Sequence, residues 1–210
     1  EFRMRGINQV QVNNKAGMTF AAALRSILRA DPDVVLIGEI RDQETANIAI
    51  EASLTGHLVL STLHTNDAPS AVTRLTEMGV EPFLLSSSLA AVMAQRLARR
   101  LCKKCKRQDT ATEAELRTLG VPHMPDTPLP TIWRPVGCRE CANTGYSGRV
   151  AIQQVMGVDS TMEDLIARGA TSIDIDKAAK EQGMTTLRKD GWQKALQGIT
   201  SVEEVLRVTV

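Results

Sequence analysis

The four cysteines of the chain form two C-x-x-C pairs, Cys102 with Cys105 and Cys138 with Cys141, and 32 residues lie between the pairs. Two such pairs can supply four thiolates to one zinc ion, and this closed shell leaves no position for a reacting water. Disulfides are the alternative, but they are rare in a chain without an export signal, and a redox-active thiol pair would need only one C-x-x-C unit. The spacing therefore predicts a structural zinc site.

A carboxylate and an imidazole follow two short aliphatic runs earlier in the chain. Glu39 comes just after the run at residues 34–37, and His64 follows the run at residues 58–61. Such runs are typical of parallel strands that are buried on both faces, and groups at the carboxyl ends of these strands face the ligand crevice. We expect Glu39 to polarise a water or to order a magnesium-bound phosphate, and His64 to sense a γ-phosphate. The alternatives are a surface carboxylate and a structural histidine.

The chain before the first cysteine is expected to alternate strands and helices around these groups. Thr19 and Asp42 are suited to cap helices, and Gly56 is suited to end one. The two aliphatic runs with a helix between them predict a parallel crossover. Strands are expected over residues 7–12, 34–37 and 58–61, and helices over residues 18–30, 42–54, 68–78 and 82–99.

The composition changes at Cys102. Five prolines lie between Pro122 and Pro135, which is typical of a loop-rich lobe, and one short helix is expected over residues 112–119. Beyond the cysteines the sequence predicts a strand over 149–155 and small helices over 160–167, 173–182, 185–196 and 201–208. The predicted domains are residues 1–100, 101–147 and 148–210.

The charge is nearly balanced, with 25 Lys and Arg against 24 Asp and Glu, so the chain lacks the global positive field of many nucleic-acid binders. No apolar run approaches the roughly 20 residues that a bilayer crossing needs. The chain also has no secretion signal, which predicts a cytosolic protein. Seven basic residues lie between Arg96 and Arg107. This stretch is expected to face anionic lipid, solvent or an acidic subunit surface, and no aromatic residue within it could stack bases.

The stretch from Gly6 to Pro69 closely resembles the ATPases of type II secretion and type IV pilus assembly. In that family GEIRDxET is the Walker B region and TGHLVLSTLHTNDA is the histidine box, and both strings occur here. The resemblance extends to the tetracysteine lobe, which many assembly and export members carry and retraction members generally lack. It continues to the C-terminus, although GYSGRVAIQQV has Ala151 and Gln154 where the family commonly has Gly and Glu.

The resemblance implies an α/β fold, namely the C-terminal part of a RecA-like P-loop NTPase core with a tetracysteine zinc lobe and a small helical C-terminal domain. It also implies a ring of six subunits that uses ATP, Mg²⁺ and Zn²⁺. Carried over by position, the catalytic residues are Glu39, His64 and Arg41. The nucleotide-binding residues are Gly38, Arg25, Arg29 and His57. One of the arginines is expected to reach a neighbouring subunit's nucleotide, although Arg41 could instead pair with Asp42 or Glu44.

No GxxxxGK[ST] phosphate-binding loop occurs in the 210 residues. We therefore expect a fragment of a longer enzyme that is inactive alone. Without the rest of its sheet, this fragment should expose apolar side chains at residues 34–37 and 58–60. It should therefore be poorly soluble or self-associate unless the missing part is supplied.

The function that the resemblance implies is a cytoplasmic motor, peripheral at the inner membrane face, that powers type II secretion or type IV pilus assembly. Its expected partners are further copies of itself, an inner-membrane platform protein and membrane-anchored adaptor proteins, with no specific nucleic acid. One alternative is a RecA-like ring ATPase that translocates nucleic acid in conjugation or DNA uptake, and another is a non-catalytic interaction module.

Overall fold

The structure is a computed structural model that describes residues 3–124 and 126–209. Within these residues the chain divides into two compact units. The first unit takes in the chain up to residue 65, residues 69–90 and residues 158–175, and the second takes in residues 66–68, 91–157 and 176 onward.

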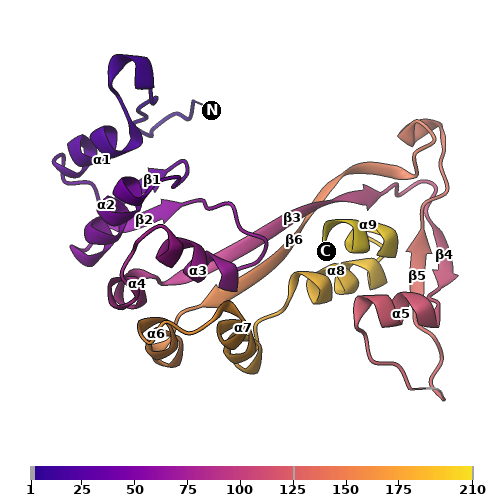
Figure 1. The fold of residues 1–210 in the computed structure, drawn as a ribbon. Coiled ribbons are helices and arrows are strands. Elements are labelled where there is room, and N and C mark those ends of the chain that lie inside the picture. Colours follow the sequence, from indigo (N-terminus) through magenta and orange to yellow (C-terminus); the bar gives the residue numbers. More distant parts are fainter. Residues whose placement is uncertain (1–2, 125, 210) are drawn as a thin grey trace. The chain divides into compact units, whose positions relative to one another are not determined.

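The first unit is built on a two-stranded parallel sheet. In the register of this sheet, Val34 lies opposite Leu58 and Ile37 lies opposite Ser61. One helix connects the two strands, so the predicted strand, helix, strand order is confirmed. The elements of the unit (Figure 1) are α1 (Phe20–Leu28), β1 (Val34–Ile37), α2 (Gln43–Leu54), β2 (Leu58–Ser61), α3 (Pro69–Glu77), α4 (Pro82–Ser88) and α6 (Ser160–Ala167), with a 3-10 turn at Asn14–Ala16.

The predicted helix caps are present. The Thr19 side chain accepts a hydrogen bond from the backbone N–H of Ala22 at 3.1 Å, and the Asp42 side chain accepts one from Thr45 at 2.8 Å. Each bond satisfies a backbone donor that the first turn of a helix leaves unpaired. Gly56, just beyond α2, has a φ of 101°, which favours glycine and ends the helix.

The prediction that β1 and β2 are buried on both faces is wrong for this chain. Val35 and Ile37 are each 4% exposed, whereas Val34 is 54% and Leu36 is 66% exposed. Successive side chains of a strand point to opposite faces, and only one face of this sheet is covered within the described residues. Leu58 and Leu60 of β2 are also exposed. The expected exposure of apolar side chains is therefore confirmed for Val34, Leu36, Leu58 and Leu60, and it is wrong for Val35 and Ile37.

The strand predicted over residues 7–12 is also wrong. The described structure has only turn and irregular conformation there, and the nearest pairing is an isolated bridge between Asn13 and Met18. Ile7 and Val10 are 54% and 52% exposed. Alternating apolar residues form a strand only when a neighbouring strand accepts the backbone hydrogen bonds and one face is buried.

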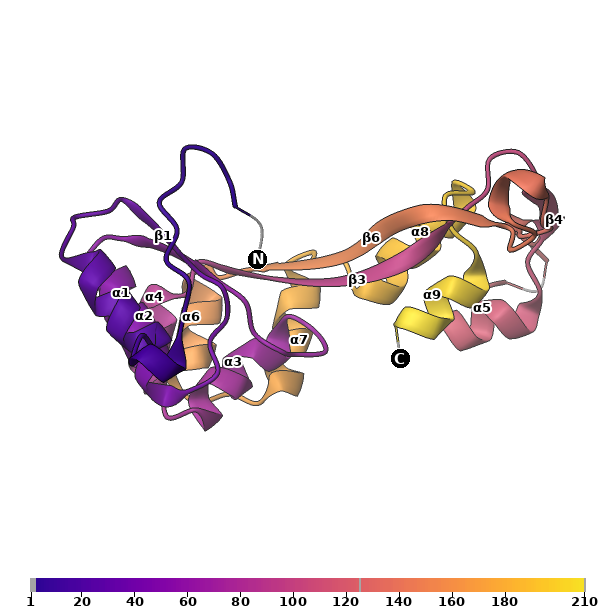
Figure 2. The same cartoon turned by 90° about the horizontal axis from the view of Figure 1, so that it is seen from above.

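The second unit is built on two long antiparallel strands that run together over their whole length (Figure 2). Their register places Ala91 opposite Gly157 and Arg99 opposite Arg149, with an irregularity between Arg99 and Leu101. The elements of the unit are β3 (Ala91–Leu101), β4 (Arg107–Thr110), α5 (Glu113–Leu119), β5 (Thr131–Arg134), β6 (Tyr146–Gly157), α8 (Leu187–Leu196) and α9 (Val202–Val208), with a 3-10 turn at Arg139–Cys141. Helix α7 (Ser172–Glu181) has residues in both units.

The helix predicted over residues 82–99 is correct only in its first part. Helix α4 ends at Ser88, and residues 91–101 form β3 instead. The residues of β3 are good helix formers, so their local preference favours the wrong structure. Pairing with β6 overrides that preference, because it buries Ala94 and Ala98 together with Ile152 and Met156. The strand predicted over 149–155 is correspondingly longer in the structure.

The predicted helices after residue 158 are confirmed, with shifts of one or two residues at their ends. Helix α8 packs on β6 and α9 packs on β3. The Glu204 side chain of α9 is 1% exposed and accepts hydrogen bonds from Arg99 and Arg207. Burial disfavours the charged carboxylate, but the bonds from the two arginines outweigh burial and hold the pKa of Glu204 at about 2.

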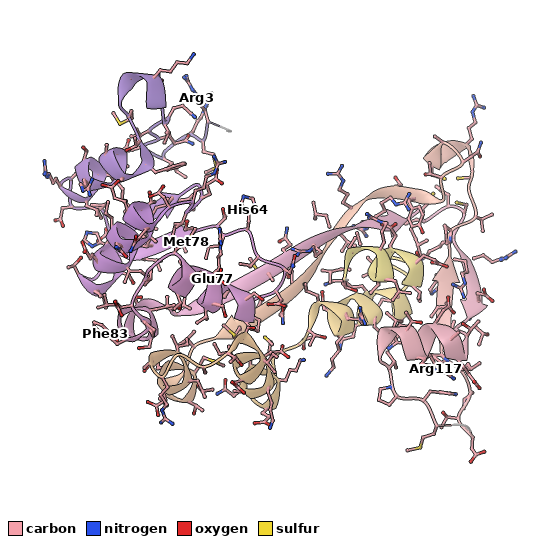
Figure 3. All side chains as sticks on the ribbon, in the orientation of Figure 1. Arg3, His64, Glu77, Met78, Phe83 and Arg117 are labelled. Atoms are coloured by element: carbon pink, nitrogen blue, oxygen red, sulfur yellow. The ribbon has the colours of Figure 1, made fainter. Side chains whose placement is uncertain are left out.

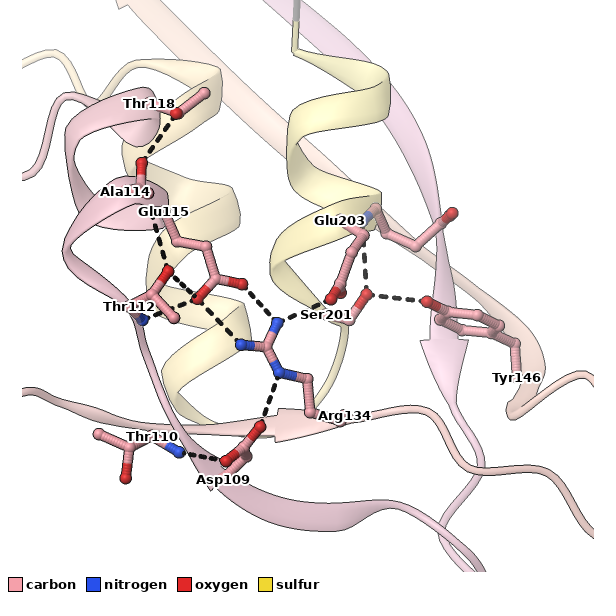
Figure 4. Close-up of polar contacts among 11 residues, drawn as sticks. Asp109, Thr110, Thr112, Ala114, Glu115, Thr118, Arg134, Tyr146, Ser201 and Glu203 are labelled. Atoms are coloured by element: carbon pink, nitrogen blue, oxygen red, sulfur yellow. Dashed lines mark hydrogen bonds and ion pairs between the residues drawn. The ribbon is translucent and has the colours of Figure 1, made fainter.

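A second polar network joins the elements of the cysteine-rich lobe (Figure 4). Arg134 of β5 donates to Asp109 of β4 at 3.0 Å, to Glu115 of α5 at 2.9 Å and to Glu203 of α9 at 2.7 Å. The guanidinium holds the pKa of Glu115 below its usual range. One arginine thus ties β5 to three other elements, two of the cysteine-rich lobe and the C-terminal helix α9.

Candidate functional site

The four cysteines come together as one cluster. Their Sγ atoms all lie within 4.8 Å of one another, and the distances are 3.7 Å from Cys138 to Cys141, 3.8 Å from Cys105 to Cys141 and 3.9 Å from Cys102 to Cys138. A disulfide needs about 2.05 Å, so these cysteines are not bonded in pairs. Tetrahedral zinc with bonds of about 2.3 Å places its sulfurs about 3.8 Å apart. The cluster therefore has the dimensions of a four-thiolate zinc shell.

Tight turns aim the sulfurs of each C-x-x-C pair inward. The backbone N–H of Lys106 donates to Cys102 O at 3.0 Å, and that of Asn143 donates to Cys138 O at 2.9 Å. Gly137, with a φ of 111°, leaves no room for a side chain, because a Cβ there would lie 2.7 Å from Asn143 O.

Backbone N–H groups also point at the sulfurs. Gly137 donates to Cys105 Sγ at 3.3 Å, and Gly145 donates to Cys141 Sγ at 3.3 Å. Burial raises the pKa of Cys141, but N–H donors from Cys138 and Gly145 outweigh it and lower the pKa to about 6. Burial raises the pKa of Cys105 to about 11. Four adjacent thiols do not all ionise without a cation, and a divalent metal would deprotonate them together.

The predicted carboxylate and imidazole meet at one edge of the parallel sheet. Glu39 Oε2 lies 3.4 Å from His64 Nε2, and Glu39 Oε1 lies 2.5 Å from Arg41 Nη2. The Glu39 side chain is 21% exposed, while that of His64 is 89% exposed. His64 comes from the loop after β2 (Figure 3). The hydrogen bond from Arg41 is the main reason that the pKa of Glu39 lies below its usual range. Glu39 is therefore a carboxylate at neutral pH.

Backbone contacts between the two strand ends hold this arrangement. Thr62 Oγ1 donates to Gly38 O at 2.7 Å, and the N–H of Ile40 donates to Thr62 O at 3.1 Å. The loops that carry Glu39 and His64 are thus bonded to each other directly. A carboxylate beside an imidazole can order a water or a metal-bound phosphate between them.

The other predicted nucleotide-binding residues lie outside this cluster. Arg25 pairs with Glu44 at 2.7 Å, and Arg29 is an exposed residue at the end of α1. His57 Nδ1 lies 3.0 Å from Ala52 O, at the end of α2. The pairing of Arg41 with Asp42 or Glu44 that the sequence left open is not found in the described structure. The partner of Arg41 is Glu39.

Three of the seven basic side chains in the stretch 96–107 are bonded to other residues of the chain. Arg96 donates to Asn66, Arg99 pairs with the buried Glu204 and stacks over Tyr146, and Lys106 donates to Gly198 O. The remaining basic side chains of the stretch are exposed, and they are Arg100, Lys103, Lys104 and Arg107. In the described residues, no helix combines the length and apolar character that a membrane crossing requires.

The sequence analysis missed two side chains that bind the end of the histidine loop, which is the segment 62–68 between β2 and α3. Gln154 Oε1 accepts from the N–H of Ala68 at 3.2 Å, and Arg96 Nη2 donates to Asn66 O at 2.9 Å. A polar residue at a buried strand position was the available signal for Gln154, which is 3% exposed. The sequence showed only that Gln154 replaces the family's usual Glu.

The sequence matches curated proteins of two kinds along its whole length. It is 54% identical over 209 residues to the type II secretion system protein E of Pseudomonas aeruginosa and 51% identical over 210 residues to the type IV pilus assembly ATPase PilB of Thermus thermophilus. The chain spans 41% of the first protein and 24% of the second.

Solved structures share the fold at lower identity. The crystal structure of the pilus retraction motor PilT with bound ADP aligns with a TM-score of 0.63 and 24% identity, over 90% of this chain and 43% of that chain. The ATPase DotB of Legionella pneumophila aligns with a TM-score of 0.61 and 21% identity, over 90% of this chain and 42% of that chain. A family profile described as Type II/IV secretion system protein matches residues 1–207. The chain belongs to this family of secretion and pilus ATPases.

Proposed function

We propose that this chain is the part of a cytoplasmic, ring-forming ATPase that carries its Walker B carboxylate and histidine box, and that ATP hydrolysis by the whole protein powers type II secretion or type IV pilus assembly. The observation that carries this proposal is the meeting of Glu39 and His64, 3.4 Å apart, at the carboxyl ends of two parallel strands. Ligands of open parallel sheets bind at this edge.

The site residues take the following roles in this proposal. Glu39, already ionised, orders the magnesium-bound phosphates or the attacking water, and His64 donates a hydrogen bond to the γ-phosphate. Arg41 neutralises Glu39 in the resting chain and, when released, stabilises charge in the transition state. Gly38 lines the nucleotide through its backbone, while Arg25, Arg29 and His57 bind nucleotide or pass its state to the next subunit of a homohexamer.

The chain supplies only part of this machine. Mg²⁺ neutralises phosphate charge in such enzymes, and the P-loop that holds it does not occur in these 210 residues. We assign residues 1–100 to the RecA-like core, 101–147 to the cysteine lobe and 148–210 to a C-terminal helical domain, and we expect the chain alone to be inactive.

Zinc is the metal that best fits the cysteine cluster, and its role here is structural. Cys102, Cys105, Cys138 and Cys141 would fill all four positions of a tetrahedral ion. The partners are an inner-membrane platform protein and a membrane-anchored adaptor. The exposed cations beside the cluster, Arg100, Lys103, Lys104 and Arg107, are available to anionic lipid.

The test is ATP turnover by the whole protein with Glu39→Gln, beside Glu51→Gln as a matched control. Glu51 is an exposed carboxylate on α2 and has no role in the proposal. We expect Glu39→Gln to lower kcat by roughly 100-fold or more, while zinc content and the hexamer persist. Glu51→Gln should leave all three unchanged. Full turnover by Glu39→Gln would refute the Walker B assignment.

A further inference from the structure

Two side-chain hydroxyls continue the contact between β1 and β2 at the end where the site lies. The last residues paired in the register of the sheet are Ile37 and Ser61. Ser61 Oγ donates to Ile37 O at 3.1 Å, and Thr62 Oγ1 donates to Gly38 O at 2.7 Å. Backbone carbonyls need a hydrogen-bond donor where regular pairing ends, and these hydroxyls supply one from the neighbouring strand.

Thr62 is bonded to both residues that flank Glu39. Its hydroxyl donates to Gly38 O, and its backbone oxygen accepts from the N–H of Ile40 at 3.1 Å. Gly38 directly precedes Glu39 in the sequence, and Ile40 directly follows it. Two hydrogen bonds on either side of Glu39 restrict where its backbone can lie relative to Thr62. The backbone bond is available to any residue at position 62, whereas the hydroxyl bond depends on the side chain.

His64 follows Thr62 by only two residues, so the position of Thr62 bears on both members of the site. The His64 side chain is 89% exposed, and packing against the described residues therefore contributes little to its placement. Its Nε2 nevertheless lies 3.4 Å from Glu39 Oε2. All of these residues belong to the first unit. The backbone that carries His64 is thus bonded directly to the backbone that carries Glu39.

We propose that Thr62 is a positioning residue for the ATPase reaction, whose hydroxyl holds Glu39 and His64 in place relative to each other through its bond to Gly38. This inference rests on the proposed function of the Glu39–His64 site. The hydroxyl hydrogen of Thr62 is donated to Gly38 O, so Thr62 acts through the backbone of the site and not by contact with the nucleotide.

The experiment is a double-mutant cycle on kcat in the whole protein, with Thr62→Val, His64→Ala and the two combined. Valine keeps the branched shape of threonine but has no hydroxyl. We expect Thr62→Val to lower kcat about tenfold, the loss expected for one hydrogen bond, with little change in KM for ATP. Because Thr62 acts on the placement of Glu39 relative to His64, the two losses should be non-additive, with the double variant only slightly slower than His64→Ala.

Two further variants separate positioning from general damage. Thr62→Ser keeps the hydroxyl and should retain most of the turnover. Thr76→Val is the matched control, because Thr76 is an exposed threonine of the same unit whose Oγ1 donates to a backbone oxygen, that of Val72, at 3.1 Å. This control should leave kcat and KM unchanged. Thermal unfolding of each variant monitors the fold.

Three results would overturn the positioning role: additive losses of Thr62→Val and His64→Ala, a folded Thr62→Ser variant as slow as Thr62→Val, or a rise in KM at unchanged kcat, which would indicate direct contact with the nucleotide. Full turnover by His64→Ala would also overturn it, since nothing would then need to be positioned. In each case a loss of turnover in Glu39→Gln would leave the ATPase assignment standing. Full turnover by Glu39→Gln would instead refute the proposed function itself.

Discussion

The cysteine cluster and the Glu39–His64 pair differ in how much of each site the chain itself supplies. The cluster has four ligands within 4.8 Å, backbone donors to its sulfurs and two buried members. The pair has one partly exposed carboxylate and one histidine that is 89% exposed. A closed metal shell is complete in a short segment, whereas a site for a phosphate-bearing ligand draws on several separate parts of a protein.

The strands of the two units differ in the same way, because one pair is covered by this chain and the other is covered on one face only. In the second unit, β3 and β6 pair along their length and bury Ile152 and Met156. In the first, Leu36 and Leu60 remain exposed on the sheet. The second unit is therefore expected to owe its stability to contacts within this chain, and the first to depend on what covers its open sheet face.

The largest expected effect comes from Cys105→Ser, with Lys104→Ser as the control from the same turn. Loss of one thiolate should reduce zinc below one ion per chain and destabilise the second unit by several kcal/mol, since metal binding free energy is folding free energy. Lys104 is exposed and should tolerate the change. Metal analysis with thermal unfolding measures both. A cooperative, metal-free second unit in Cys105→Ser would remove the contrast between the two sites.

Glu204→Gln gives the next largest effect. The Glu204 carboxylate is 1% exposed and bonded to two arginines, so it should contribute about 3 kcal/mol to the free energy of unfolding. The exposed Arg25–Glu44 pair should contribute less than about 1 kcal/mol to the same quantity. The comparison variant is therefore Glu44→Gln. Denaturant unfolding of each provides the measurement, and equal losses would contradict the assignment of the buried pair as the stronger one.

The pH dependence of the same residue is a separate prediction. The pKa of Glu204 is about 2 in the folded chain against an ordinary value of 4.5, so its stabilisation is fully present above about pH 4.5 and is lost as the pH falls toward 2. Unfolding free energies measured between pH 5 and pH 2.5 should fall more steeply for the wild type than for Glu204→Gln. Parallel curves would show that Glu204 titrates normally.

The sequence predicted the parts of the molecule that local chemistry determines. The caps Thr19 and Asp42, the parallel crossover and the gathering of the cysteines follow from residue type and spacing. The meeting of Glu39 and His64 followed because parallel strands end at the same edge.

Long-range pairing determined the parts that could not be predicted. Residues 91–101 have helical preferences and become a strand only because β6, some 55 residues later, pairs with them. The anchoring of Ala68 by Gln154 spans 86 residues, and no periodicity in the sequence reveals it. The basic stretch likewise could not show that Arg99 and Lys106 are bonded within the fold.

The smallest expected effect on stability tests the open face of the first sheet. Leu36 is 66% exposed and Ile37 is 4% exposed, although they are neighbours on β1. Leu36→Thr should change the unfolding free energy by less than about 0.5 kcal/mol, because it removes no buried contact. Ile37→Thr should lower the unfolding free energy by about 2 kcal/mol or more, because it buries a hydroxyl and leaves a cavity.

We expect the larger effect on self-association from Leu36→Thr and the smaller one from Ile37→Thr. An exposed apolar strand face drives association between copies of the isolated chain, so Leu36→Thr should shift sedimentation toward the monomer. Ile37→Thr, whose side chain faces inward, should not produce that shift. Equal destabilisation by Leu36→Thr and Ile37→Thr would mean that this chain's own residues cover the outer face of β1 in solution. The contrast between a self-sufficient second unit and an open first unit would then no longer hold.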